Sequence, residues 1–211
     1  MLFFWNIRGI TTPGKRTCIN DTLSKHNPSI ISFQETKKEH LTHAFLKAIS
    51  RGKNYDWHHL PAEGTSGGVL VGVDLDIFYV ISWTPLKFSV SCVLTLKKKG
   101  ISFRFIAVYG SPYDEGKDDF LSELHSLFID DHLPTVIGGD FNLVRYQEDK
   151  SNGKINHNWS DKFNAWIEIW SLLEIRMFGR QFTWANNQEN LIMSTIDSLL
   201  YNRTRCSFPF K

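Results

Sequence analysis

The segment from Thr135 to Asn142 has the residue types and spacing most suggestive of chemistry in this chain. Its apolar residues end in two glycines, after which Asp140 and Asn142 follow two positions apart. Side chains two positions apart in an extended segment leave the same face, so the carboxylate and the amide are predicted to point together. The carboxyl end of a strand is where α/β folds bind ligands, and Gly138 and Gly139 would let a ligand approach the backbone. An Asp/Asn turn that closes a core strand explains the same residues equally well.

Four more polar residues lie at or near the ends of apolar strands: Asn6, Glu35, Tyr109 and Asp197. Each also has a structural explanation, namely a turn cap, the start of a helix, core packing and an edge strand, respectively. Together with Asp140 and Asn142, they supply the groups that metal-assisted phosphodiester hydrolysis uses. Mg²⁺ needs one or two carboxylates besides water and phosphate oxygens. The attacking water needs an acceptor to orient it, and the developing phosphate charge needs donors.

Alternating strands and helices must position these residues. The patterns predict strands over 2–7, 29–33, 67–73, 88–96, 101–109, 135–138, 182–184 and 195–201. They predict helices over 15–24, 41–49 and 120–128. A further helix is predicted to begin at Ser160 as its N-cap, with an apolar stripe of Phe163, Trp166, Ile167, Trp170 and Leu173. Lys97–Gly100 is predicted to be the charged turn of a hairpin. The sequence therefore indicates one α/β domain over residues 1–211.

Composition excludes several classes of protein. With 211 residues and 42% hydrophobic residues, the chain can form a core and is not expected to be disordered. Its net charge of +2 is far below that of avid non-specific nucleic-acid binders. Three scattered cysteines, Cys18, Cys92 and Cys206, indicate a reducing compartment rather than a disulfide framework. The apolar start is too short for a signal peptide or a membrane span, so we expect a soluble protein that is not secreted.

The chain resembles the endonuclease/exonuclease/phosphatase superfamily. Within it, the chain is most similar to the apurinic-type endonuclease domain of plant non-LTR (long interspersed element, LINE) retrotransposons. The Gln-Glu-Thr and Gly-Asp-Phe-Asn motifs are specific for the superfamily, and Phe-Thr-Trp followed by two asparagines points to the retrotransposon branch. The matching segments are Trp5–Gly9, Gln34–Lys37, Gly67–Val69, Tyr109–Pro112, Gly138–Asn142, Phe182–Asn187 and Ile196–Asp197.

This resemblance implies a fold, a reaction and a set of residue roles. The fold would be a four-layer α/β sandwich with two packed mixed sheets, and the protein would be a monomer that nicks DNA with Mg²⁺ or Mn²⁺ in the nucleus, or that resides in the cytoplasm before import. Glu35 would be the metal ligand, and Asn6 would assist metal or phosphate binding. Tyr109 and Asn142 would contact the phosphate, and Asp140 would orient or activate the water. Asp197 matches an acid that orients a catalytic histidine.

The sequence departs from the superfamily pattern after Asp197. That pattern ends with a Ser-Asp-His strand, whereas residues 203–211 contain no such triplet and no histidine follows His157. His58, His59 and His157 lie in polar, loop-like surroundings, and we interpret them as surface residues rather than replacements. We therefore expect an endonuclease domain that is incomplete at its C-terminus, lacks its last strand and is catalytically impaired. Loss of a general acid or base typically costs about 10²–10⁴ in rate.

Two other functions remain open at this stage. The first is a phosphatase of the same superfamily that acts on a small phosphorylated substrate. The second is a catalytically dead nucleic-acid-binding remnant, which would use Lys and Arg contacts to phosphates and stacking by tryptophans.

Overall fold

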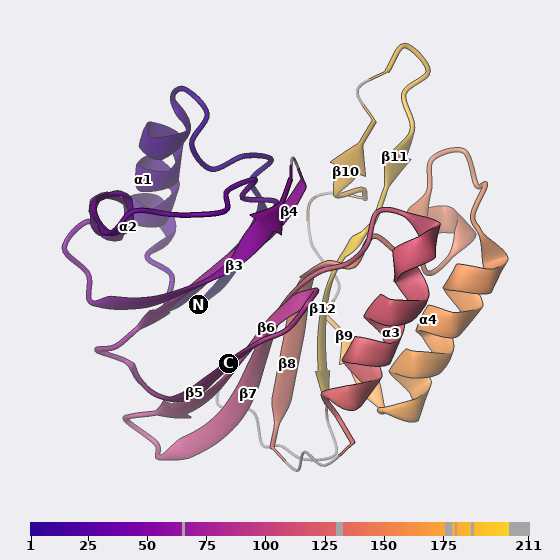
Figure 1. The fold of residues 1–211 in the computed structure, drawn as a ribbon. Coiled ribbons are helices and arrows are strands. Elements are labelled where there is room, and N and C mark those ends of the chain that lie inside the picture. Colours follow the sequence, from indigo (N-terminus) through magenta and orange to yellow (C-terminus); the bar gives the residue numbers. More distant parts are fainter. Residues whose placement is uncertain (65, 130–132, 176–178, 180, 187, 203–211) are drawn as a thin grey trace. The chain divides into compact units, whose positions relative to one another are not determined.

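The computed structural model describes residues 1–64, 66–129, 133–175, 179, 181–186 and 188–202. Asn187, Cys206 and the rest of 203–211, which entered the sequence argument, lie outside the described residues. The fold is α/β with two mixed sheets and four helices, which confirms the predicted class (Figure 1). Contacts group the chain into two compact units, Met1–Tyr109 and Gly110–Lys211, which are described separately below.

The first unit begins with a four-stranded sheet in the order β1-β2-β4-β3. Its strands are β1 (Leu2–Asn6), β2 (Ile30–Gln34), β4 (Ser66–Asp74) and β3 (Tyr55–Glu63). β1 and β2 are parallel, whereas β4 is antiparallel to both of its neighbours. Helices α1 (Lys15–His26) and α2 (His43–Ser50) cover one face of this sheet (Figure 1). Ile19, Leu23 and Ile49 from these helices pack with Ile31 and Phe33 of β2, so burial of apolar area holds the layers together.

Three antiparallel strands complete the first unit: β5 (Phe78–Pro85), β6 (Ser89–Leu96) and β7 (Ile101–Tyr109). Leu96 pairs with Ile101 across the charged turn, which confirms the predicted hairpin. These strands pack on the first sheet within the unit. The rings of Phe4 and Phe105 lie 5.6 Å apart, and the Trp83 indole N–H donates to Asp56 Oδ2 at 2.9 Å.

The second unit contains the antiparallel strands β8 (Thr135–Asp140), β12 (Asp197–Asn202) and β9 (Leu172–Glu174), with β12 between the other two. Helices α3 (Lys117–Ser126) and α4 (His157–Ile169) lie side by side in this unit (Figure 1). Phe163 of α4 packs against Phe141, which follows β8, with ring centroids 5.1 Å apart. Short 3₁₀ turns η1 (Asp114–Gly116) and η2 (Gln147–Asp149) and the hairpin β10 (Trp184–Ala185)–β11 (Met193–Ser194) complete the unit.

The sequence-based interpretations of Ser160, His58 and His59 are wrong. Ser160 is not an N-cap, because α4 begins at His157 and the side chain of Asn156 accepts the N–H of Trp159. Ser160 instead lies buried inside the helix, where its hydroxyl donates to the carbonyl of Arg145. The second error concerns His58 and His59, which lie half-buried in strand β3 and not in a surface loop.

Strands β3, β5 and β9 were not predicted, and Leu173, which was expected in the helix after Ser160, lies in β9 because α4 ends at Ile169. β5 buries only one of its eight residues fully, and β3 mixes polar and aromatic residues, so neither shows the alternation of a half-buried strand. Pairing with β4 and β6 determines their conformation. His157, by contrast, is exposed as interpreted. No helix among the described residues is long and apolar enough to cross a membrane.

Burial of the β3 histidines predicts a pH dependence of stability. The His58 ring stacks on Trp83 at 5.0 Å, and desolvation lowers its pKa although Asp56 opposes the shift. Desolvation also lowers the pKa of His59, and His40 and His58 add to that effect while a backbone hydrogen bond at Lys38 opposes it. These two histidines therefore bind protons more readily in the unfolded chain than in the folded protein. Stability is complete above the unfolded pKa of about 6.5 and falls as the pH drops through the lower folded pKa values.

We expect Tm to be lower at about pH 5.5 than at about pH 7.5. The double variant His58→Gln/His59→Gln should recover about 2–4 °C of that difference. Thermal unfolding followed by circular dichroism at both pH values measures the two Tm values. The exposed His157→Gln variant is the control, and it should retain the full pH dependence of the wild type. A double variant with the same pH dependence as the wild type would contradict this assignment.

Candidate active site

The first group of predicted site residues lies at the carboxyl ends of β1 and β2. Asn6 is the last residue of β1 and pairs with Gln34, the last residue of β2, and Glu35 follows directly. Because the two strands are parallel, their carboxyl ends meet at one edge of the sheet. The structure thus brings Asn6 and Glu35 to the same edge of the first unit.

The backbone around Glu35 is held in an unusual conformation. Glu35 has φ 56°, and Arg8 and Lys37 also have left-handed backbones, with φ 51° and 55°. Such values are uncommon for residues with a side chain and persist only where surrounding contacts fix them. Here the carbonyl of Glu35 accepts the N–H of Gly9 at 2.8 Å. The turn after β1 therefore fixes the position of the residue after β2.

Gly68 of β4 holds the segment around Glu35 through a hydrogen bond to the next residue, Thr36. Its carbonyl accepts the N–H of Thr36 at 3.1 Å, and its φ is 85°. A Cβ at this position would lie 2.2 Å from Thr36 Oγ1, so only glycine fits. Gly68, the second glycine of the motif, thus has a packing role: it leaves room for the buried Thr36 next to Glu35.

The chemistry of this edge suits a hard cation. The Glu35 carboxylate is partly accessible, with 18% of its side chain exposed, and its Oε1 lies 2.9 Å from the Lys37 ammonium. The side-chain carbonyl oxygen of Gln34 is buried and has no hydrogen-bond partner among the described residues. Carboxylate and amide oxygens are the ligands of Mg²⁺, which takes few protein ligands and keeps several waters. No cluster of three or more His, Cys, Asp or Glu that could hold a metal ion occurs in the described part of the chain.

Tyr109 is the last residue of β7 and is half-buried. Its backbone N–H donates to the carbonyl of Phe88 at 2.9 Å, which holds the end of the strand against the start of the neighbouring one.

The second group of predicted site residues lies at the paired ends of β8 and β12. Asp140, the last residue of β8, is 2% exposed and stands directly opposite Asp197, the first residue of β12. Directly opposed residues in an antiparallel pair share a face. The side chains of Asp140 and Asp197 are therefore neighbours.

The extended geometry predicted for Asp140–Asn142 is wrong at its last residue. Asn142 has φ 52°, a left-handed conformation that asparagine tolerates. Its backbone N–H donates to Asp140 Oδ1 at 3.0 Å, and its side-chain amide donates to the carbonyl of Gly110 at 2.8 Å. The motif thus forms the Asp/Asn turn that was its structural alternative, and that turn fixes the orientation of the Asp140 carboxylate.

Thr183, which was not among the predicted site residues, positions Asp197. Its hydroxyl accepts the backbone N–H of Ile196 at 3.1 Å and that of Asp197 at 3.3 Å. The carbonyl of Ile196 in turn accepts the N–H of Phe141 at 2.9 Å. The Phe-Thr-Trp motif contains this threonine, so the motif drew attention to the segment but did not indicate these hydrogen bonds.

Asp197 also lines a cavity of about 330 Å³ within the second unit. Its polar wall includes Asp149 and Glu174, and its apolar wall includes Ile175 and Leu199. Burial raises the pKa of the Asp149 carboxyl, and the nearby Glu174 and Glu148 add to the shift, although the hydrogen bond from Tyr146 opposes it.

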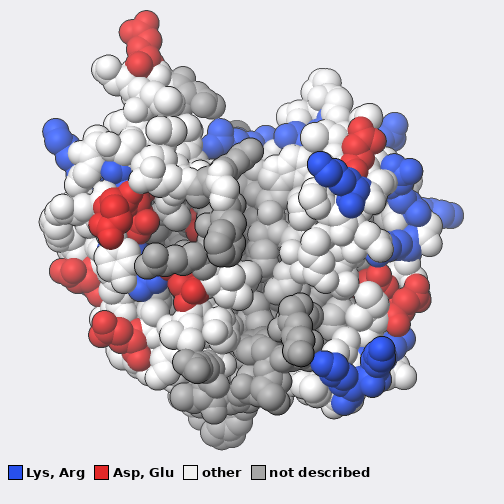
Figure 2. Space-filling view, turned by 180° about the vertical axis from the view of Figure 1, so that it is seen from behind, with Lys and Arg blue, Asp and Glu red and all other residues white. Residues whose placement is uncertain are grey.

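Charge is divided unevenly between the two units. Of the 24 Lys and Arg, 14 lie in residues 1–109 together with 7 of the 22 Asp and Glu; residues 110–211 hold the other 10 and 15. Figure 2 shows one face, on which basic side chains predominate over the first unit and acidic ones over the second. A polyanion would be attracted chiefly to the first unit.

Comparison with known families decides the relationship of the chain. The sequence model of the Endonuclease/Exonuclease/phosphatase family matches residues 3–208. The chain belongs to this family. Its members are typically magnesium-dependent. A comparison with curated protein sequences finds no match.

Solved structures of the family have the same fold. A 3′ phosphatase from Neisseria, bound to a product DNA hairpin, matches with TM-score 0.71 and 16% identity over 95% of this chain and 86% of the other. The endonuclease domain of TRAS1, a telomere-specific non-LTR retrotransposon, gives TM-score 0.70 and 14% identity over 95% and 84%. An AP endonuclease from Archaeoglobus fulgidus gives TM-score 0.68 and 14% identity over 95% and 86%. At these identities, the likeness concerns the fold.

Each unit thus contains three of the six predicted site residues. Asn6 and Glu35 meet at one sheet edge in the first unit, where Tyr109 ends another strand, and Asp140, Asn142 and Asp197 are neighbours in the second. The sequence also predicts one cleft with Tyr109 nearby, and this convergence stays a prediction for Asn6, Glu35, Asp140, Asn142 and Asp197.

Proposed function

We propose that this protein is a metal-dependent phosphodiester hydrolase that nicks DNA in the manner of a retrotransposon endonuclease. The observation that best supports the proposal is the Asp140 carboxylate, which is buried, opposed by Asp197 and oriented by the Asn142 N–H. Such a fixed acceptor suits the orientation of an attacking water. The excess of basic residues in the first unit suits a phosphate backbone as substrate.

The remaining residues have matching roles in this proposal. Glu35, with help from Asn6, would hold the metal, which when bound neutralises charge on phosphoryl oxygens. Tyr109 and Asn142 would donate hydrogen bonds to the phosphate. In the family pattern, the acid that corresponds to Asp197 orients a histidine. DNA as substrate, the plant LINE origin, the monomeric state and the nuclear location belong to the same proposal.

Relaxation of supercoiled plasmid by the 211-residue polypeptide tests the reaction. We expect slow conversion to open circles in Mg²⁺ and none in EDTA. DNA binding without any metal-dependent nicking would instead indicate a nucleic-acid-binding remnant. Release of phosphate from small phosphorylated substrates, with intact plasmid, would indicate a phosphatase.

Titration of Mg²⁺ by isothermal calorimetry tests the metal ligand directly. We expect modest affinity in the wild type and a loss of at least about tenfold in Glu35→Gln, because the substitution removes the charge of the carboxylate proposed to bind the metal. Glu39→Gln is the matched control, since Glu39 is a 77% exposed acid four residues further on. Equal affinities of wild type and Glu35→Gln would exclude Glu35 as the ligand.

A further inference from the structure

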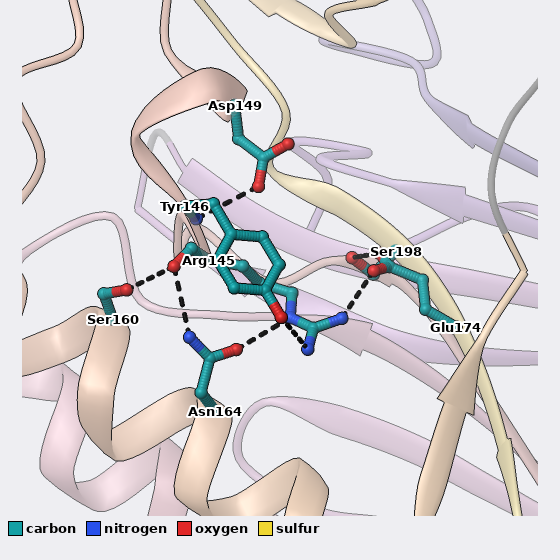
Figure 3. A network of polar contacts seen from close by, with 7 residues as sticks. All are labelled: Arg145, Tyr146, Asp149, Ser160, Asn164, Glu174 and Ser198. Carbon is teal, nitrogen blue, oxygen red and sulfur yellow. Dashed lines mark hydrogen bonds and ion pairs between the residues drawn. The ribbon is translucent and has the colours of Figure 1, made fainter.

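Arg145 joins several separate segments of the second unit around the Asp140–Asp197 pair. It lies in the irregular segment that follows Asn142, and only 15% of its side chain is exposed. Figure 3 shows its guanidinium between Tyr146, Asn164 and Glu174. Nothing in the local sequence of Arg145 identifies these partners, so its role could not be predicted from the sequence.

The guanidinium donates in three directions. Its Nε donates to Asn164 Oδ1 of α4 at 2.8 Å, its Nη1 to Glu174 Oε2 of β9 at 2.5 Å, and its Nη2 to the Tyr146 hydroxyl at 2.9 Å. The backbone carbonyl of Arg145 accepts further hydrogen bonds from the side chains of Ser160 and Asn164 on α4 (Figure 3). Hydrogen bonds therefore fix both the guanidinium and the backbone carbonyl of Arg145.

The contacts continue from β9 to β12. The other carboxylate oxygen of Glu174 accepts the hydroxyl of Ser198 at 2.7 Å. Ser198 follows Asp197 directly and pairs with Gly139, the neighbour of Asp140. β9 has only three residues, so this side-chain link adds substantially to its attachment to β12. A closed ring results, which runs from β8 through Asn142 to Arg145, then through Glu174 and Ser198 back to β8.

We propose that Arg145 is a positioning residue for the hydrolytic reaction, because its guanidinium closes the ring that fixes Asn142 and Asp197 relative to Asp140. This inference rests on the proposed function for its catalytic consequence, whereas its structural consequence stands independently. The planar fork of arginine bonds three partners in fixed directions. Lysine keeps the charge but is a single point donor, so Arg145→Lys separates fork geometry from charge.

Hydrogen exchange of the Asn142 amide, measured by NMR, tests the structural part. This N–H donates to Asp140 Oδ1, so its protection reports the turn itself. In Arg145→Lys we expect its exchange to accelerate about tenfold or more, while amides of α3 keep their wild-type rates. Ser198→Ala, which removes one hydroxyl from the ring, should give a smaller change in the same direction and serves if Arg145→Lys does not fold.

The control is Lys162→Met. It removes another ion pair of the same unit, Lys162 to Asp118 at 2.6 Å, which joins α4 and the first turn of α3 outside the ring. This variant should leave the Asn142 amide unchanged. Equal exchange in Arg145→Lys, Ser198→Ala and wild type, or acceleration of all amides of the unit together, would overturn the proposal.

Nicking kinetics test the catalytic part. We expect Arg145→Lys to lower kcat by about 10–100-fold with KM for DNA changed less than about twofold, because misplacement of reacting groups costs rate and not substrate binding. Unchanged kcat beside accelerated exchange would refute the positioning role. Complete absence of nicking in the wild type would refute the proposed function, and the exchange result would still decide whether Arg145 positions the pair.

Discussion

We expect Asp140→Asn to slow Mg²⁺-dependent plasmid nicking by about 10²–10⁴-fold, the range for loss of a positioned acid or base. The substitution keeps the shape of the side chain and an oxygen that can accept the Asn142 N–H at its present 3.0 Å. It removes the negative charge and with it the ability to attract a proton from water. The turn should survive, so DNA affinity is expected to stay within about twofold while kcat falls.

The design of this experiment separates catalysis from folding. Asp161→Asn changes an exposed acid on α4 of the same unit and should leave kcat unchanged. Circular dichroism melts of both variants check that the buried substitution has not unfolded the second unit. A folded Asp140→Asn variant that nicks as fast as wild type would exclude Asp140 from the chemistry.

Sequence patterns predicted the elements that contain the site because those elements are locally determined. In β8, apolar residues and two glycines precede Asp140, and all six residues of the strand are buried. The β6–β7 hairpin follows from two apolar runs around a charged turn. Five of the six predicted site residues stand at strand ends or directly after them, as predicted: Asn6, Glu35, Tyr109, Asp140 and Asp197.

What the sequence could not predict depends on contacts distant along the chain. The left-handed turn at Asn142 is selected partly by its hydrogen bond to Gly110, 32 residues earlier. Arg145 finds Glu174 29 residues later, and Asp197 relies on Thr183. Half-buried strands such as β3 have polar and apolar residues on both faces, so that periodicity alone cannot distinguish them from loops.

The histidines of β3 illustrate the same limitation in chemical terms. The polar surroundings of His58 and His59 suggest a loop, yet His59 lies 3.5 Å from the hydroxyl of Thr36, beside the Glu35 segment. Pairing of β3 with β4 creates this proximity, since His59 stands opposite Leu70. Sequence spacing of 23 residues gives no hint of it.

Appending a strand with a Ser-Asp-His triplet to the 211-residue polypeptide is expected to raise its nicking rate by about 10²–10⁴-fold. Under the proposed function, Asp140 orients the water and Glu35 holds the metal, so substrate binding is not expected to require the addition. No histidine follows Asp197 in the 211 residues, and the histidine of the appended strand would supply proton transfer and part of the charge stabilisation on the phosphoryl oxygens.

The control for this gain is the same extension with alanine in place of its histidine. This variant should bind DNA as well as the active extension but nick no faster than the 211-residue polypeptide, because only the proton-transfer group differs. Asp140→Asn in the extended chain should abolish the gain, which would show that the histidine and Asp140 act on the same reaction. Fast nicking by the 211-residue polypeptide, lost in Asp140→Asn and unchanged by the extension, would mean that the water oriented by Asp140 needs no histidine in this protein.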